Sequence, residues 1–351
     1  MTWQTRKLGD ILELRYGKSL PARKRTSGEV PVYGSGGIDG HNELALIKGP
    51  GVIVGRKGSV GSVFFEARDF FPIDTVYYVW PKHDAIDVRF AYYLLKNLPL
   101  ASLNTDAAVP GLNRERALSI AVRLPDQSGQ ETILSILSAY DDLIQNNRRR
   151  ITLLEEAARI LYREWFVRLR FPGHEHVKII DGLPEGWGWK SFGDVAELRY
   201  GKALKEENRI EGLFPVYGSS GIVGTHEAAL IEGPSIIVGR KGNVGSLFWS
   251  PVDFWPIDTV YFIPKEQSDF WLYLALPSAG FQSTDAGVPG LNRDFAYSRK
   301  LVQPSVRIRR QFNEAVEPMF RQCATMETFN RKLAQARDLL LPALMSGEVT
   351  V

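Results

Sequence analysis

The sequence predicts an α+β protein with two β-rich modules in a pseudo-two-fold arrangement, separated by two long antiparallel coiled-coil helices. Three observations predict this fold. Most of the chain is an internal repeat, each copy contains short β-branched and aromatic runs bounded by turn residues, and each copy is followed by a long heptad stretch. The 351 residues exceed one typical core, and the long period makes each copy a self-sufficient domain.

The repeat keeps a constant offset of 184 residues between segments 8–79 and 192–263, where 43 of 72 positions are identical. Its matching parts include the Gly-rich loop GRKGSVG at residues 55–61, which returns as GRKGNVG at residues 239–245. A later pair, TDAAVPGLNR and TDAGVPGLNR, has an offset of 179. The change of offset falls near a predicted short helix in each copy, and it leaves the Gly-rich loops in register.

A heptad stripe follows each copy of the repeat. Ten positions at a period of 3.5 predict a coiled coil, with each helix roughly 50 Å long. The obvious partner of each helix is the other one, and a polar Asn in each stripe can fix the register. The stripes are Ile133, Leu137, Tyr140, Ile144, Asn147, Ile151, Leu154, Ala158, Leu161 and Trp165, then Phe312, Val316, Met319, Cys323, Met326, Asn330, Leu333, Arg337, Leu340 and Leu344.

The direction of the helices follows from the path of the chain. Two helices that each lead away from their own module, and that pair side by side, run antiparallel with a module at each end. We therefore predict a first module at residues 1–125, a helix at 126–172, a connector at 173–188, a second module at 189–304 and a helix at 305–351.

Known catalytic patterns are missing from the chain. The GKS at residues 17–19 resembles the end of a phosphate-binding loop, but Leu12 stands where that loop requires Gly. The alternating His and Glu at residues 174–176 lie in a polar connector, where such a trio is usually solvated rather than metal-bound. The single Cys323 excludes an intramolecular disulfide, and its heptad position is typical of a small core residue. We predict a non-enzyme without catalytic residues or a metal site.

The Gly-rich loops are the predicted DNA-binding site. Glycine permits positive φ and close backbone approach, and Ser, Arg and Lys donate to phosphates and base edges. The alternative is that the glycines only close hairpins. This alternative is disfavoured because both copies keep a basic pair, Arg56–Lys57 or Arg240–Lys241, while the surrounding residues differ. The candidate DNA-binding residues are Tyr33, Ser35, Gly36, Arg56, Lys57, Ser59, Thr75 and Asn113, with Tyr217, Ser219, Ser220, Arg240, Lys241, Asn243, Thr259 and Asn292 in the second copy.

Other polar segments keep two interpretations. Flanking loops are predicted at residues 74–75 and 106–114 and, in the second copy, at 258–259 and 285–293. For these, capping or turn roles are an equal alternative to contact with a ligand. The three arginines at residues 148–150 are typical of a solvated helix face, and contact with phosphate or an acidic partner is the other interpretation.

Together these features resemble the specificity subunit of type I restriction–modification systems, over essentially the whole chain. The resemblance rests on LIQNNRRRITLLEEAARILYREWFVRLRFPG at residues 143–173, LPEGW at 183–187 and RDLLLPALMSGEV at 337–349. The loops VYGSGG and VGRKGSVG resemble those of its target recognition domains. The resemblance implies a non-catalytic reader of double-stranded DNA, in which each recognition domain reads one half of a bipartite target.

The resemblance also implies partners and cofactors. The long helices would set the gap between half-sites and bind two methyltransferase subunits, through which restriction subunits join. S-adenosylmethionine, ATP and magnesium would be held by those partners, and none by this chain. No apolar run approaches the ~20 residues that span a bilayer, so we expect a cytoplasmic protein without membrane association.

The chain departs from the family because its two recognition domains are close copies, whereas those of one subunit usually differ widely. Similar domains related by a two-fold axis predict inverted, near-palindromic half-sites. Asp39 against Val223, His41 against Thr225 and Ser59 against Asn243 are differences that would change one base pair between halves.

The alternatives to a specificity subunit are a stand-alone two-headed DNA-binding regulator and a nuclease with an unrecognised site. A net charge of only +3 favours a subunit that borrows basic surface from its partners.

Overall fold

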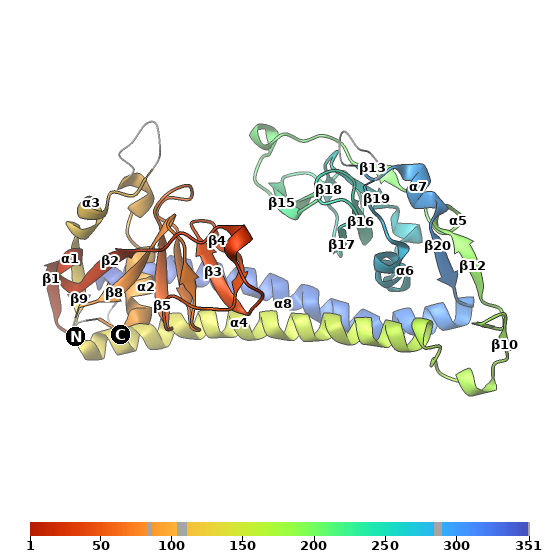
Figure 1. Ribbon diagram of the computed structural model, residues 1–351, viewed down its shortest axis with the longest axis horizontal. Helices are drawn as coiled ribbons and strands as arrows, with labels where there is room; N and C mark the ends of the chain where they lie inside the picture. The colour runs from red at the N-terminus through yellow and green to blue at the C-terminus, as the bar shows by residue number, and fades with distance from the viewer. Residues whose placement is uncertain (83–85, 104–110, 284–289, 350–351) are drawn as a thin grey trace. The chain divides into compact units, whose positions relative to one another are not determined.

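A computed structural model describes residues 1–82, 86–103, 111–283 and 290–349 (Figure 1). The chain divides into two compact units. Unit 1 comprises Met1–Asn146 together with Phe329–Val351, and unit 2 comprises Asn147–Thr328. Each unit therefore contains one copy of the repeat and a segment of both long helices.

The first module, in unit 1, is built on a four-stranded antiparallel sheet of order β2-β8-β5-β6. A three-stranded sheet, β4-β3-β7, and the antiparallel pair β1-β9 complete it. The strands are β1 (Trp3–Lys7), β2 (Leu12–Tyr16), β3 (Val30–Gly34), β4 (Gly37–Asn42), β5 (Gly51–Gly55), β6 (Val63–Glu66), β7 (Phe71–Pro72), β8 (Val76–Pro81) and β9 (Ala121–Pro125). The β-branched strand β5 is buried at every position, as expected of a central strand.

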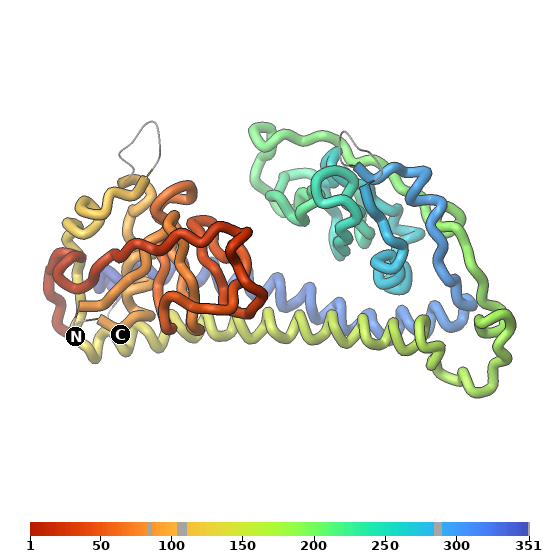
Figure 2. Tube along the Cα trace, viewed as in Figure 1, coloured from red at the N-terminus to blue at the C-terminus, as the bar shows by residue number. Residues whose placement is uncertain are grey.

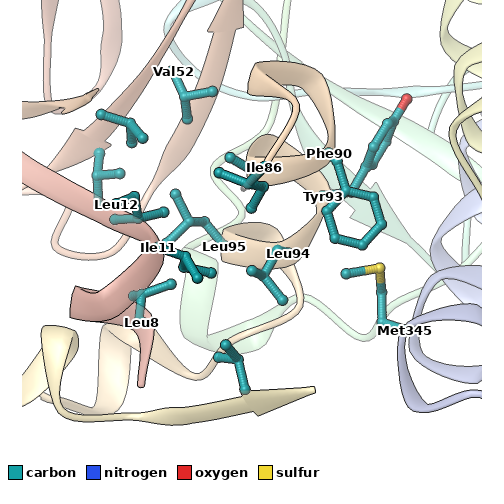
Figure 3. Packing of buried hydrophobic residues seen from close by; sticks show 14 of the residues in the cluster. Leu8, Ile11, Leu12, Val52, Ile86, Phe90, Tyr93, Leu94, Leu95 and Met345 are labelled. Carbon is teal, nitrogen blue, oxygen red and sulfur yellow. The ribbon is translucent and has the colours of Figure 1, made fainter. Parts of the chain in front are cut away.

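Short helices cover this module: α1 (Leu8–Ile11), α2 (Val88–Lys96) and α3 (Arg114–Leu118). Asp87 caps α2 by accepting hydrogen bonds from the amides of Arg89 and Phe90, at 2.7 and 3.1 Å. Figure 3 shows the apolar face of α2, including Phe90, directed into the main core of the unit. Met345, near the end of the second long helix, belongs to the same core, so that helix end is part of unit 1.

The second module, in unit 2, repeats these sheets with the orders β13-β19-β16-β17, β15-β14-β18 and β12-β20. The strands are β12 (Gly188–Ser191), β13 (Arg199–Tyr200), β14 (Phe214–Gly218), β15 (Gly221–His226), β16 (Ser235–Gly239), β17 (Leu247–Ser250), β18 (Trp255–Pro256), β19 (Val260–Ile263) and β20 (Lys300–Gln303). Its helices are α5 (Phe192–Val195), α6 (Phe270–Ala275) and α7 (Arg293–Ser298). In the connector, β10 (Ile179–Ile180) pairs with β11 (Leu183–Pro184).

The second module is fixed to the start of a long helix through Asp269. This residue caps α6 by accepting from the amide of Leu272 at 2.9 Å. Its other carboxylate oxygen accepts from Arg309 at 2.6 Å and from Asn313 at 2.8 Å. Trp271, which is fully buried, lies under the Arg309 guanidinium at 4.3 Å. The module and the helix therefore share one core.

The long helices are α4 (Gln127–Tyr162), which continues into a π-helical turn at Arg163–Val167, and α8 (Val306–Ser346). None of the twenty predicted heptad positions is exposed. In unit 2 the two helices run antiparallel, because Cys323 contacts the carbonyl of Ile151 while Phe312 packs on Trp165. In unit 1 the segments of the two helices, whose backbone Figure 2 traces, share the main core, and Arg337 forms an ion pair with Asp141. The predicted pairing of the helices is confirmed within each unit.

Two further features bear on the sequence predictions. In the described part of the chain, no helix is long and apolar enough to cross a membrane. The connector trio forms an exposed 3-10 turn, His174–His176, and the described residues contain no group of three His, Cys, Asp or Glu placed to hold a metal ion.

Candidate nucleic-acid interface

Backbone hydrogen bonds join the predicted loops of the first module into one frame. The amides of Arg56 and Lys57 donate to the carbonyl of Thr75, at 3.0 and 3.1 Å. The amide of Leu112 donates to the carbonyl of Arg56 at 2.8 Å, and the Ser62 hydroxyl donates to the carbonyl of Ser35 at 2.6 Å. Four segments that are far apart in sequence therefore meet around the basic pair.

The second module repeats this frame bond for bond. Arg240 and Lys241 donate to the carbonyl of Thr259, at 2.9 and 3.0 Å. The amide of Leu291 donates to the carbonyl of Arg240 at 2.8 Å, and Ser246 donates to the carbonyl of Ser219 at 2.6 Å. The internal repeat thus preserves the geometry of the loops as well as their sequence.

Two glycines in each basic loop are required by the backbone. Gly58 and Gly61 have φ of +80° and +77°, and their copies Gly242 and Gly245 have +76° and +77°. A Cβ at Gly61 would also lie 2.4 Å from the backbone nitrogen of Ala101. These glycines therefore shape the loop, and the Arg and Lys side chains, together with Ser59 or Asn243, are the groups of the loop that can contact a ligand.

An exposed tyrosine lies between two arginines beside the basic loop of the first module. The Arg56 guanidinium carbon is 5.0 Å from the centre of the Tyr16 ring, and that of Arg114 is 5.6 Å away. The ring of Tyr16 is 52% exposed and packs edge-on against Tyr77 at 5.0 Å. Arg56 also donates to the carbonyl of Asp74 at 2.8 Å, which fixes the direction of its side chain.

The second module has the same cluster. Arg240 and Arg293 lie 5.0 and 5.5 Å from the ring of Tyr200, which is 51% exposed. Tyr200 packs on Tyr261 at 5.0 Å, and Arg240 donates to the carbonyl of Asp258 at 3.0 Å. We call each set of two arginines and one exposed tyrosine an Arg–Tyr–Arg cluster.

The inner tyrosines support these clusters from below. Burial raises the pKa of Tyr77 and of Tyr261 to about 12. Each hydroxyl therefore stays protonated and donates to a backbone carbonyl, that of Leu112 at 3.3 Å or that of Leu291 at 3.1 Å. The segment carrying Arg114 or Arg293 is held beside the exposed ring by this bond.

The cationic groups of the basic loops are uncompensated within the described structure. Arg56, Lys57, Arg240 and Lys241 form no ion pair with a described carboxylate, whereas arginines elsewhere, such as Arg25, do. Unpaired guanidinium and ammonium groups beside exposed aromatic rings are suited to phosphate oxygens and base edges.

Most predicted DNA-binding residues lie at or near these frames, exposed or half-buried. Gly36, Lys57, Ser59, Ser220, Asn243 and Asn292 are exposed, whereas Ser35, Arg56, Thr75, Asn113, Ser219, Arg240, Lys241 and Thr259 are half-buried.

Four predicted residues have structural roles. Tyr33 and Tyr217 are only 5% exposed in the cores of their modules, and Tyr33 donates to Glu66 at 3.0 Å, so a DNA contact does not fit their burial. The side-chain oxygens of Asn113 and Asn292 cap α3 and α7, at 3.0 and 2.8 Å from the amides they accept. Residues 106–110 and 285–289 of the predicted flanking loops lie outside the described residues.

Sequence reasoning did not single out the exposed tyrosines or their second arginines. A usable signal was present, because Tyr16 and Tyr200 lie in the identical text ELRYGK, and Arg114 and Arg293 end the identical text GLNR. That text did not reveal that the two segments meet at one ring.

The fold and the duplicated cationic frames are typical of a two-module nucleic-acid reader, and comparison with known proteins gives the family. The family of type I restriction modification DNA specificity domains matches residues 1–156 and 184–288. The chain belongs to this family, whose role is DNA sequence specificity.

Relatives and a solved structure agree. The type I restriction enzyme MjaIX specificity subunit of Methanocaldococcus jannaschii is 22% identical over 76% of this chain and 70% of its own length. Two putative type I specificity subunits of Mycoplasma pneumoniae are 20% and 30% identical; they match 91% and 62% of this chain, and 90% and 59% of their own lengths. The fold resembles that of a type I restriction–modification S subunit from M. genitalium, with a TM-score of 0.57 and 20% identity over 98% of this chain and 96% of that one.

Proposed function

We propose that this chain is the DNA-reading subunit of a type I restriction–modification complex, and that each module reads one half of a bipartite target. The family membership supports the class of function. The observation that carries the mode of reading is the duplicated frame, which holds the basic pairs Arg56–Lys57 and Arg240–Lys241 and places the arginine of each pair beside an exposed tyrosine.

The chemistry of the frame fits base and phosphate recognition. A guanidinium donates to the two acceptors of guanine in the major groove, and Lys contributes a charge for phosphate. The backbone carbonyls of Asp74 and Asp258 orient the two guanidinium groups before binding, which reduces the conformational entropy lost on binding. Because the frames are alike, the half-sites should be alike and inverted, as in other two-fold readers of DNA.

In this complex the chain would bind DNA, and its partner subunits would catalyse the reactions. Two methyltransferase subunits would bind the long helices, and restriction subunits would join through them, so that S-adenosylmethionine, ATP and magnesium are held by the partners. Exposed apolar side chains on the helices support a docking role: Leu153 and Ile160 on the part of α4 in unit 2, and Leu339 on the part of α8 in unit 1.

Selection of DNA from a randomised duplex pool tests this function. The full chain is assembled with its methyltransferase and compared with Arg56→Ala/Lys57→Ala and with Arg240→Ala/Lys241→Ala. We expect the wild type to select two short half-sites with a fixed gap, and each double variant to lose sequence preference in one half while assembly is kept.

The matched control is Arg6→Ala/Lys7→Ala, which removes two charges from the exposed strand β1. It should weaken binding uniformly through fewer phosphate contacts and leave both half-sites intact. Loss of assembly in the loop variants would show that the basic pair is structural, and tight selective binding by the chain alone would favour a stand-alone regulator.

A further inference from the structure

Among the side chains that differ between the two modules near the frame, one in the first module is a carboxylate held by an arginine. In the first module, Arg25 donates to the carboxylate of Asp39 at 2.8 Å and also to the Asp39 carbonyl. The Arg25 side chain is 13% exposed, whereas the Asp39 side chain is 60% exposed. The pair therefore has no net charge, and it presents a carboxylate to its surroundings.

The second module keeps the arginine and lacks the carboxylate. Arg209 donates to the carbonyl of Val223 at 2.7 Å and to that of Leu204 at 3.4 Å. Among the buried polar atoms of the described residues, its Nε has no hydrogen-bond partner. Because the hairpin forms there with valine, the carboxylate of Asp39 is not needed to build the hairpin.

The differing residue and the threonine that holds the basic loop both lie near Gly34. A Cβ built at Gly34 would be 3.7 Å from the Cβ of Asp39 and 3.7 Å from the hydroxyl of Thr75. A Cβ built at Gly218 would be 3.2 Å from Cγ1 of Val223 and 3.5 Å from the hydroxyl of Thr259. Since the carbonyls of these threonines accept from both amides of the basic pair, Asp39 and Val223 lie close to the frame that carries the predicted DNA-binding residues.

We propose that Asp39 and Val223 read the one base at which the two half-sites differ, cytosine for the first module and thymine for the second. This inference rests on the proposed function. An ionised carboxylate only accepts hydrogen bonds and is repelled by phosphate, which leaves base amino groups as its partners. Cytosine presents an amino group in the major groove where thymine presents a carbonyl oxygen and a neighbouring methyl group, and valine suits that methyl group.

Two other differences compete for this role. Ser59 against Asn243 and His41 against Thr225 also separate the modules, and Ser59 and Asn243 are both exposed. The side chain of Asp39 is distinguished because its direction is fixed by Arg25. A positioned acceptor discriminates bases better than a free side chain, since less conformational entropy is lost on contact.

The test measures the cytosine-over-thymine preference of each half-site with the full chain bound to its methyltransferase. Four duplexes, derived from a target selected from a randomised pool, carry cytosine or thymine at the differing position of either half. For the wild type we expect about a ten- to a hundredfold preference for cytosine in one half and for thymine in the other. Asp39→Val should convert the first half to thymine, and Val223→Asp should give the second half a preference for cytosine.

The control Glu43→Val removes the same charge from an exposed residue close to the same hairpin and should leave both ratios unchanged. Equal tightening of both duplexes by Asp39→Val would mean a charge effect only, and a switch caused by Ser59→Asn instead would assign the reading to the basic loop. Either result overturns the inference. Co-elution of each variant with the methyltransferase verifies folding.

Different results overturn the proposed function and the role of Asp39. A wild-type complex without any sequence preference overturns the proposed function. A wild-type complex that selects a bipartite target, together with an Asp39→Val variant of unchanged preference, overturns only the assignment of Asp39.

Discussion

The Arg–Tyr–Arg cluster allows a quantitative test, because its central ring is exposed and its neighbours are defined. Tyr16→Leu removes the ring that lies under Arg56 and Arg114, at 5.0 and 5.6 Å. Each cation–π contact at an exposed site contributes about 0.5–1 kcal/mol. These contacts hold the two guanidinium groups in place before DNA binds, so their loss costs at most about 1–2 kcal/mol of binding free energy, which is a half-site weaker by up to about 30-fold.

Competition binding with the assembled complex measures this effect. A labelled duplex containing both half-sites is displaced by duplexes in which one half has been scrambled. Tyr16→Leu should weaken the half-site of the first module only, and Tyr200→Leu the other. Tyr16→Phe keeps both ring contacts and should bind nearly as the wild type.

Two results would show that the ring of Tyr16 does not support reading of the first half-site. If Tyr16→Phe loses as much affinity as Tyr16→Leu, the hydroxyl acts and the ring does not. If Tyr16→Leu weakens both half-sites equally, the cluster is not part of one reading surface.

Three further predictions concern stability. Arg337→Ala should lower the free energy of unfolding by about 3 kcal/mol in urea titrations, because it leaves the half-buried carboxylate of Asp141 without its cation. A change of less than about 1 kcal/mol would mean that this ion pair contributes no more than a solvent-exposed one. Hydrogen bonds from the hydroxyl of Thr2 and from two backbone amides lower the pKa of Asp126 from 3.8 to about 2. The ionised carboxylate therefore stabilises the fold above pH 4, and this stabilisation is lost as the pH falls towards 2. Between pH 4 and pH 2 the melting temperature of the wild type should fall towards that of Asp126→Asn. Gly17→Ala would place a Cβ 2.1 Å from a backbone oxygen and should lower the free energy of unfolding by about 1–3 kcal/mol. In the control Gly36→Ala the new Cβ meets nothing within 4 Å, so thermal unfolding should give a free energy within about 0.5 kcal/mol of the wild type.

The large-scale organisation could be predicted from the sequence because it depends on spacing. The heptads placed hydrophobic residues on one side of each helix, and even the polar Asn147 and the charged Arg337 at those positions are not exposed. Arg337 is tolerated there because Asp141 and Asp338 accept its hydrogen bonds. The sequence did not show these partners, since they depend on which turns of the two helices meet.

The candidate site was only partly predictable, because identity between copies marks core and surface alike. Tyr33 and Tyr217 are retained for packing, yet they lie in the same text as the half-buried Ser35. Tyr16 was missed for the converse reason. It reads as the third apolar residue of the alternating strand LELRY, in which Leu12 and Leu14 are buried, whereas Tyr16 is exposed at the end of the strand and packs on Tyr77.

If the duplicated frames read duplicated half-sites, mapping of methylated sites will reveal it. The gene is expressed with its methyltransferase in a host that lacks other such systems, and modified positions are read across the genome. We predict one motif with two inverted half-sites, identical except at one base pair, separated by a fixed run of unspecified bases. Two unrelated half-sites, or a single continuous site, would contradict the account.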